Sequence, residues 1–82
     1  MSQPVCLITG AGDGTGAAIA RRFAAAGYRV ALLARTEARL KNLEKELAGS
    51  RGYVCDVSDL DHLRATVAKA SSELGAPRVA IN

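Results

Sequence analysis

The fold of this chain is decided by eight residues near its start, Thr9-Gly10-Ala11-Gly12-Asp13-Gly14-Thr15-Gly16. They hold four of the eight glycines of the sequence, at alternate positions. The apolar run VCLI (residues 5–8) comes before them, and an alanine-rich stretch with Ile19 and Phe23 four residues apart follows over residues 15–26. A short apolar run between Pro4 and glycines is typical of a strand covered on both faces. The sequence therefore predicts a strand, a glycine-rich turn and a helix in direct succession.

The same alternation continues to the end of the chain. Apolar runs at 30–34, 53–55 and 79–81 predict three more strands. Between them, leucines at helical spacing predict a helix that begins after Thr36 and another that begins at Ser58, with Asp61 completing a capping box. The order β-α-β-α-β-α-β with short connections predicts an α/β fold, a Rossmann-type doubly wound parallel sheet. In such a sheet the first strand is central, the second lies beside it and the third lies beyond the second.

Composition excludes several classes of protein. The 82 residues suffice for one domain, and 49% of them are hydrophobic, which is ordinary for a folded protein. The 11 basic residues are dispersed and only 4% of residues are aromatic, so we expect no nucleic-acid partner. No apolar run approaches the roughly 20 residues of a membrane span, and the start of the chain does not resemble a signal peptide. We therefore expect no membrane association.

The two cysteines, Cys6 and Cys55, have no metal-ligand spacing. They fall on the first and third strands, two strand spacings apart, which is too far for a disulfide. The sequence predicts two free thiols, no metal site, and a cytoplasmic or other reducing intracellular setting.

The glycine-rich turn predicts a phosphate-binding loop. Backbone N–H groups at the positive end of a helix dipole hold phosphate oxygens, and side chains in the loop would keep the ligand away. A nucleoside-triphosphate loop would need Gly-Lys-Ser/Thr, but Ala17 follows Gly16. A methyltransferase that binds S-adenosylmethionine remains an alternative, although Ile8 and Ala34 or Arg35 stand where its acidic residues would be. The loop in this context favours a dinucleotide.

The end of the second strand bears on the choice of dinucleotide. Enzymes that use NAD place an acidic residue there for the ribose 2′-hydroxyl, whereas this chain has Ala34-Arg35. A guanidinium suits a 2′-phosphate, so NADP is predicted, with NAD possible; the alternative for Arg35 is a solvated surface arginine.

At this point the sequence resembles the short-chain dehydrogenase/reductase family over all 82 residues. Residues 9–16 match its TGxxxGxG motif, residues 55–59 (CDVSD) resemble its segment whose first aspartate contacts the adenine amino group, and residues 79–82 (VAIN) resemble the start of its fourth-strand motif.

Two residues depart from the family pattern. Asp13 stands where many NADP-dependent members have a basic residue, and Thr15 replaces a common apolar one. For Asp56 the alternative role is a cap of the turn into the third helix, and the only histidine, His62, is expected to be exposed. The cofactor-binding residues implied are Thr9, Gly10, Gly12, Asp13, Gly14, Thr15, Gly16, Arg35, Asp56, Val57 and Asn82.

The resemblance implies hydride transfer between a nicotinamide and a carbonyl or hydroxyl group of a small molecule, assisted by a Tyr-x-x-x-Lys pair. The two tyrosines, Tyr28 and Tyr53, are followed four residues later by Leu32 and Val57, so no catalytic residue is assigned. We expect residues 1–82 to be the N-terminal part of one NAD(P)-binding Rossmann domain, truncated after the fourth strand and inactive alone. The complete protein is expected to be a homo-oligomer. The alternative is a non-catalytic NAD(P)-binding or sensing module.

Overall fold

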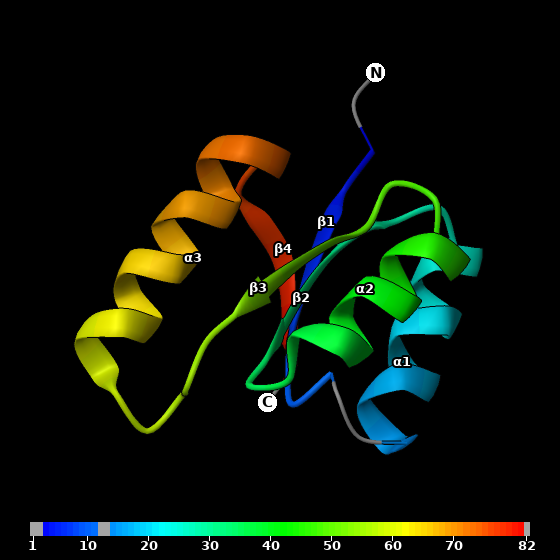
Figure 1. Ribbon diagram of the computed structural model, residues 1–82. Helices are drawn as coiled ribbons and strands as arrows, with labels where there is room; N and C mark the ends of the chain where they lie inside the picture. Colours follow the sequence, from blue (N-terminus) through cyan, green and yellow to red (C-terminus); the bar gives the residue numbers. More distant parts are fainter. Residues whose placement is uncertain (1–2, 12–13, 82) are drawn as a thin grey trace.

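The computed structural model describes residues 3–11 and 14–81. Strands and helices alternate along these residues as the sequence predicts (Figure 1). Their bounds are β1 Val5–Thr9, α1 Gly14–Ala25, β2 Arg29–Ala34, α2 Glu37–Glu46, β3 Arg51–Val54, α3 Leu60–Leu74 and β4 Pro77–Ile81.

In the described part of the chain the strands form one parallel sheet in the order β3-β2-β1-β4. Cys6 pairs with Val30 and Ile8 with Leu32 between β1 and β2, while Leu33 pairs with Tyr53 between β2 and β3. Helices α1 and α2 cover one face of the sheet and α3 covers the other (Figure 1). The prediction of a doubly wound α/β sheet is confirmed, including the order of its first three strands.

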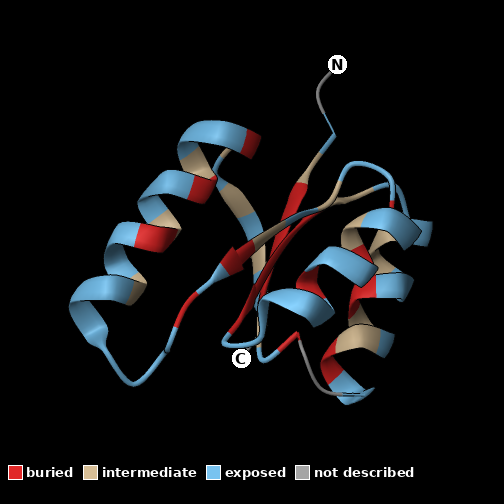
Figure 2. Ribbon diagram, in the orientation of Figure 1, coloured by how far each residue is buried: buried red, intermediate tan, exposed pale blue. Residues whose placement is uncertain are grey.

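The buried core is divided between these two faces because side chains alternate along a strand. Cys6, Ile8 and Leu32 point toward α1 and α2 and pack with Leu40 and Leu43 of α2. On the opposite face, Val5, Leu7 and Leu33 pack with Tyr53 and with Ala70 and Leu74 of α3. Figure 2 shows the buried residues concentrated on β1 and β2, in the centre of the molecule. This aliphatic centre makes the strand ends rigid supports for the loops that follow them.

The thiols of Cys6 and Cys55 are both free and buried, as predicted. Cys6 belongs to the core on the α1–α2 face and Cys55 to the core on the α3 face, so the sheet separates them. None of the helices in the described ranges has the length and apolarity that crossing a membrane requires.

One expectation about a helix start is corrected, and a second is confirmed in position only. Asp59, not Ser58, is the N-cap of α3, where its carboxylate accepts a hydrogen bond from the His62 N–H at 3.1 Å. Ser58 does not cap the helix, because both its N–H and its hydroxyl donate hydrogen bonds to Asp56. Thr36 does occupy the N-cap of α2, but its side chain makes no capping hydrogen bond. Ser, Thr and Asp side chains can all form hydrogen bonds with backbone N–H groups near a helix start. Sequence spacing alone does not show which of them does so.

Candidate cofactor-binding site

The carboxyl ends of β1, β2 and β3 meet at one edge of the sheet, and the residues that follow them line a common cleft. The cleft has a volume of about 370 Å³. Gly10 follows β1, Arg35 follows β2 and Asp56 lies just beyond β3. The complete lining is Gly10, Leu33, Ala34, Arg35, Thr36, Arg39, Cys55, Asp56, Val57 and Ser58. In open α/β sheets ligands bind at this edge, so the fold places the cleft where a ligand is expected.

Backbone hydrogen bonds beyond the strands fix the walls of this cleft. The Ala11 N–H donates to the Leu33 carbonyl at 3.1 Å, which continues the β1–β2 pairing into the glycine-rich loop. The Cys55 N–H donates to the Ala34 carbonyl at 2.9 Å and so extends the β2–β3 pairing to the residue before Asp56. The backbone leading into Gly10, Arg35 and Asp56 is therefore held by the sheet itself.

The glycines at the start of α1 have different structural roles. A Cβ added to Gly16 would lie 2.3 Å from the carbonyl oxygen of Gly10 and 2.9 Å from the Cα of Ala11, so only glycine lets α1 pack this closely on the loop. A Cβ added to Gly14 would meet nothing within 4 Å. Gly10 itself has a φ of +70°, a left-handed conformation that glycine adopts without strain. Gly16 and Gly10 thus shape the loop, whereas Gly14 leaves space open at the N-terminus of the helix.

A second cleft of about 240 Å³ lies on the α1 side of the same edge. Thr9, Thr15 and Gly16 line it, together with Ile8, Gly10, Ile19, Val57 and Ile81. The first turn of α1 carries no acidic side chain, and the positive end of the helix dipole favours an anion there. Gly10 and Val57 border both clefts, and the Val57 side chain is 41% exposed between them. A ligand longer than either cleft could therefore extend across both.

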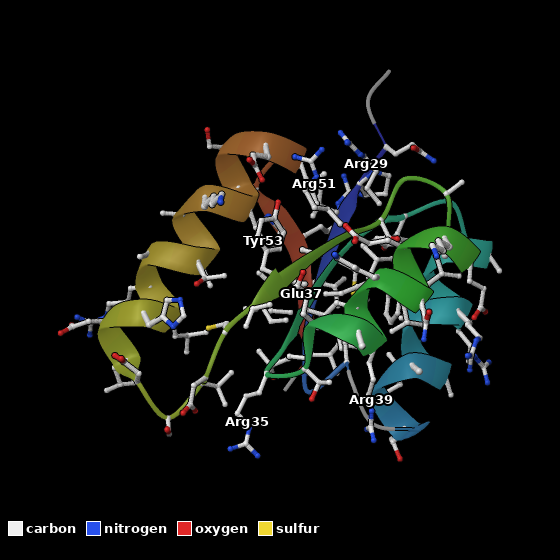
Figure 3. All side chains as sticks on the ribbon, viewed as in Figure 1. Arg29, Arg35, Glu37, Arg39, Arg51 and Tyr53 are labelled. Carbon is white, nitrogen blue, oxygen red and sulfur yellow. The ribbon has the colours of Figure 1, made fainter. Side chains whose placement is uncertain are left out.

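Arg35 and Arg39 give the larger cleft its positive charge. Both side chains extend beyond the same edge of the sheet, Arg35 from the end of β2 and Arg39 from the first turns of α2 (Figure 3). Ala34, which stands where an acidic residue would hold a ribose hydroxyl, is buried. The sequence did not indicate Arg39, because its spacing from Arg35 does not show that α2 begins beside the cleft.

Asp56 lines the same cleft as Arg35, and its carboxylate accepts hydrogen bonds from Ser58. The Oδ1 atom of Asp56 accepts hydrogen bonds from the Ser58 N–H at 3.0 Å and the Ser58 hydroxyl at 2.7 Å. These bonds, followed by the charges of Arg35 and His62, hold the pKa of the Asp56 carboxyl below its ordinary value. Asp56 therefore does cap the turn before α3, which was the alternative role left open by the sequence, and it lines the cleft as well. His62 is exposed, as expected.

The structure thus brings together eight of the eleven residues implied by the sequence. Gly10, Arg35, Asp56 and Val57 line the larger cleft, Thr9, Thr15 and Gly16 line the smaller one, and Gly14 is exposed at the start of α1. Gly12, Asp13 and Asn82 lie outside the described residues.

Neither tyrosine lines either cleft. The ring of Tyr28 packs edge-on against Phe23, with 5.1 Å between the ring centroids. The Tyr53 hydroxyl donates to Glu73 of α3 at 2.6 Å, and burial together with this carboxylate raises the pKa of Tyr53 to about 12. Both rings serve packing, so the clefts offer no tyrosine for proton transfer. Within residues 3–11 and 14–81, no group of three or more His, Cys, Asp or Glu side chains could hold a metal ion.

Comparison with known proteins agrees with this geometry. Residues 4–82 match the short chain dehydrogenase family. The chain is 47% identical to the granaticin polyketide synthase putative ketoacyl reductase 1 of Streptomyces violaceoruber, over 99% of this chain and 31% of that protein. The chain spans about a quarter to a third of the length of the relatives that it matches.

Solved structures give the same result. A variant of the actinorhodin polyketide ketoreductase crystallised with NADPH superimposes with a TM-score of 0.91 at 36% identity, over 100% of this chain and 34% of the other. The 3-ketoacyl-(acyl-carrier-protein) reductase of Brucella melitensis, complexed with NADH, superimposes with a TM-score of 0.89 at 31% identity, over 96% of this chain and 33% of the other. Since the family match spans almost every residue and the strand order and glycine-rich loop agree with it, the chain belongs to the short-chain dehydrogenase family.

Proposed function

We propose that these residues form the dinucleotide-binding part of an NADP-dependent oxidoreductase whose substrate is a small carbonyl compound or alcohol. Family membership supports the reaction class, and the relatives solved with NADPH and NADH support a nicotinamide dinucleotide as the cofactor. When bound, the dinucleotide supplies or accepts a hydride at its nicotinamide ring. The residues of this chain would bind and orient it.

The observation that carries the proposal is the composition of the larger cleft at the end of β2. Two guanidinium groups, those of Arg35 and Arg39, reach this cleft, and Ala34 occupies the position of the acid that would repel a phosphate. A guanidinium can donate two parallel hydrogen bonds to phosphate oxygens. The cleft therefore suits a ribose that carries a 2′-phosphate better than one with a free hydroxyl.

The rest of the dinucleotide fits the other parts of the site. The pyrophosphate would lie at the N-terminus of α1, where a Cβ at Gly14 would meet open space and the positive end of the helix dipole favours an anion. The adenine would lie between Asp56 and the exposed side chain of Val57, both of which line the larger cleft. Gly12, Asp13 and Asn82 remain predicted contacts by their motif positions.

The family resemblance implies a Tyr-x-x-x-Lys pair for proton transfer; this sequence has none, and neither of its tyrosines lines a cleft. We propose that such residues lie in a longer protein, which is homo-oligomeric and resides in the cytoplasm or another reducing intracellular compartment. A non-catalytic NAD(P)-binding module would share every residue described above. Family membership leaves the methyltransferase alternative without support.

Calorimetric titration of the full-length protein with NADP, NAD and S-adenosylmethionine tests the proposal. NADP should bind about 10- to 100-fold more tightly than NAD, as expected for one or two charge-assisted contacts to the 2′-phosphate. Binding of S-adenosylmethionine alone, or of no nucleotide, would refute the proposal. Tight NADP binding without NADPH oxidation by any of a panel of ketones and aldehydes would favour the non-catalytic module.

A further inference from the structure

Two hydrogen bonds from one serine converge on a single oxygen of Asp56. The Ser58 hydroxyl lies 2.7 Å and the Ser58 N–H 3.0 Å from Oδ1 of Asp56. A carboxylate oxygen accepts about two hydrogen bonds through its lone pairs, so these donors occupy Oδ1. No hydrogen bond to Oδ2 occurs within residues 3–11 and 14–81. One oxygen of the carboxylate is therefore engaged by Ser58, and the other has no hydrogen-bond partner among the described residues.

The backbone at Asp56 is held by hydrogen bonds on both its sheet side and its helix side. On the sheet side, the Cys55 N–H bonds to the Ala34 carbonyl at 2.9 Å. On the helix side, the Asp59 N–H bonds to the Asp56 carbonyl at 3.0 Å, and Asp59 in turn caps α3. Asp56 and Ser58 both line the larger cleft. Ser58 thus sits between the helix cap and the wall that a bound base would face.

We propose that Ser58 is a positioning residue that makes Asp56 a one-oxygen acceptor and thereby selects adenine over bases with a different hydrogen-bonding edge. The inference rests on the proposed dinucleotide function and concerns the recognition of its base. Adenine presents one amino donor flanked by a ring acceptor, which matches a single acceptor oxygen. Hypoxanthine presents a carbonyl in place of that amino group, so its oxygen would face the carboxylate without a proton between them. Guanine presents two adjacent donors, which would match a carboxylate with both oxygens free.

The electrostatics of the cleft are consistent with this role. The hydrogen bonds from Ser58, with the nearby charges of Arg35 and His62, lower the pKa of the Asp56 carboxyl, so at neutral pH Asp56 accepts and does not donate. An ionised acceptor distinguishes an amino group from a carbonyl group more sharply than a protonated carboxyl would.

The test compares NADP with its hypoxanthine analogue in calorimetric titrations of the full-length protein. Ser58→Ala should reduce the preference for adenine over hypoxanthine by about 5- to 10-fold, the factor expected for a weakened hydrogen bond to a charged group. Ser58→Thr keeps the hydroxyl and should retain the wild-type preference. Ser72→Ala, at an exposed position of α3 outside both clefts, is the matched control and should also retain it.

The outcomes separate this role from a structural one. If Ser58→Ala weakened both analogues by the same factor, or neither, Ser58 would not position the acceptor and the proposal would be overturned. If the wild-type protein bound neither analogue, the proposed dinucleotide function would fail and this inference with it.

A second measurement follows the pKa of the Asp56 carboxyl in the absence of any ligand. In an NMR titration of the Asp56 carboxyl, Ser58→Ala should raise the pKa toward its ordinary value, and Ser58→Thr should leave it low. An unchanged Asp56 pKa in Ser58→Ala would contradict the proposal even in a variant that binds no dinucleotide.

Discussion

Arg35 has no ion-pair partner in the described residues, and it stands at the end of a buried strand whose last residue, Ala34, is neutral. Its surroundings favour an incoming anion because Arg39 lies in the same cleft. Asp56, which lines the same cleft, accepts its hydrogen bonds from Ser58 rather than from Arg35. We therefore propose that the cofactor preference depends on this guanidinium.

Replacing Arg35 by Asp should weaken NADP binding by about 2–3 kcal/mol, because a charge-assisted contact is lost and a repelling carboxylate is added. NAD affinity should hold or rise, since a carboxylate at the end of β2 can accept from the ribose hydroxyl. Calorimetry on the full-length protein checks this, with Arg22→Asp, at an exposed position of α1 outside both clefts, as the control. Equal NADP affinity before and after Arg35→Asp would remove Arg35 from the site.

Gly14 and Gly16 allow the ligand-binding and structural roles of the loop to be separated. Gly14→Val should abolish binding of either dinucleotide while the protein stays folded, because the new side chain would occupy open space. Gly16→Val should destabilise the fold itself, because its Cβ would lie 2.3 Å from the Gly10 carbonyl oxygen. Thermal melts beside dinucleotide titrations distinguish the two variants. A Gly14→Val protein that binds NADP normally would count against the loop assignment.

At the scale of elements, apolar periodicity was enough to predict which segments are helices and which are strands. Leu40, Leu43 and Leu47 are buried on one side of α2 and its connection, as their spacing indicates. The sequence did not reveal which polar residue caps α3, because Ser58 and Asp59 both suit an N-cap and the choice depends on the position of Asp56. Arg39 was missed for a related reason, since helical spacing does not show that α2 starts beside the cleft. Tertiary contacts determine both the N-cap of α3 and the placement of Arg39 at the cleft.

The hydrogen bond between Tyr53 of β3 and Glu73 of α3 should make stability sensitive to alkaline pH. Because the pKa of Tyr53 is raised to about 12, its stabilising contribution is present below the ordinary tyrosine pKa of about 10 and is lost as pH rises toward 12. The difference in unfolding free energy between wild type and Tyr53→Phe should therefore shrink across this window. Denaturant unfolding at about pH 9 and about pH 12 measures it. A difference that stayed constant would show that the hydrogen bond does not set this pH dependence.

At the scale of the whole molecule, the strand order β3-β2-β1-β4 is what assembles the site. It places the ends of β1, β2 and β3 beside one another, so that Gly10, Arg35 and Asp56 line one cleft although 46 positions separate the first from the last in sequence. Parallel strands with short connections predict this arrangement. Proton-transfer groups could not be predicted, because the sequence lacks the motif that would supply them.

The 82-residue polypeptide alone should show no reductase activity, since neither Tyr28 nor Tyr53 lines a cleft. NADPH consumption with a panel of carbonyl compounds, measured for this polypeptide and for the full-length protein side by side, checks the prediction. Turnover by the 82 residues would mean that another of their side chains transfers the proton.

The most direct test is a crystal structure of the full-length protein with NADP. The pyrophosphate should lie against the N-terminus of α1 beside Gly14, with the 2′-phosphate at Arg35 and the adenine amino group at Oδ2 of Asp56. Density for the dinucleotide at any other place, with the edge between β1, β2 and β3 filled by protein, would contradict the account.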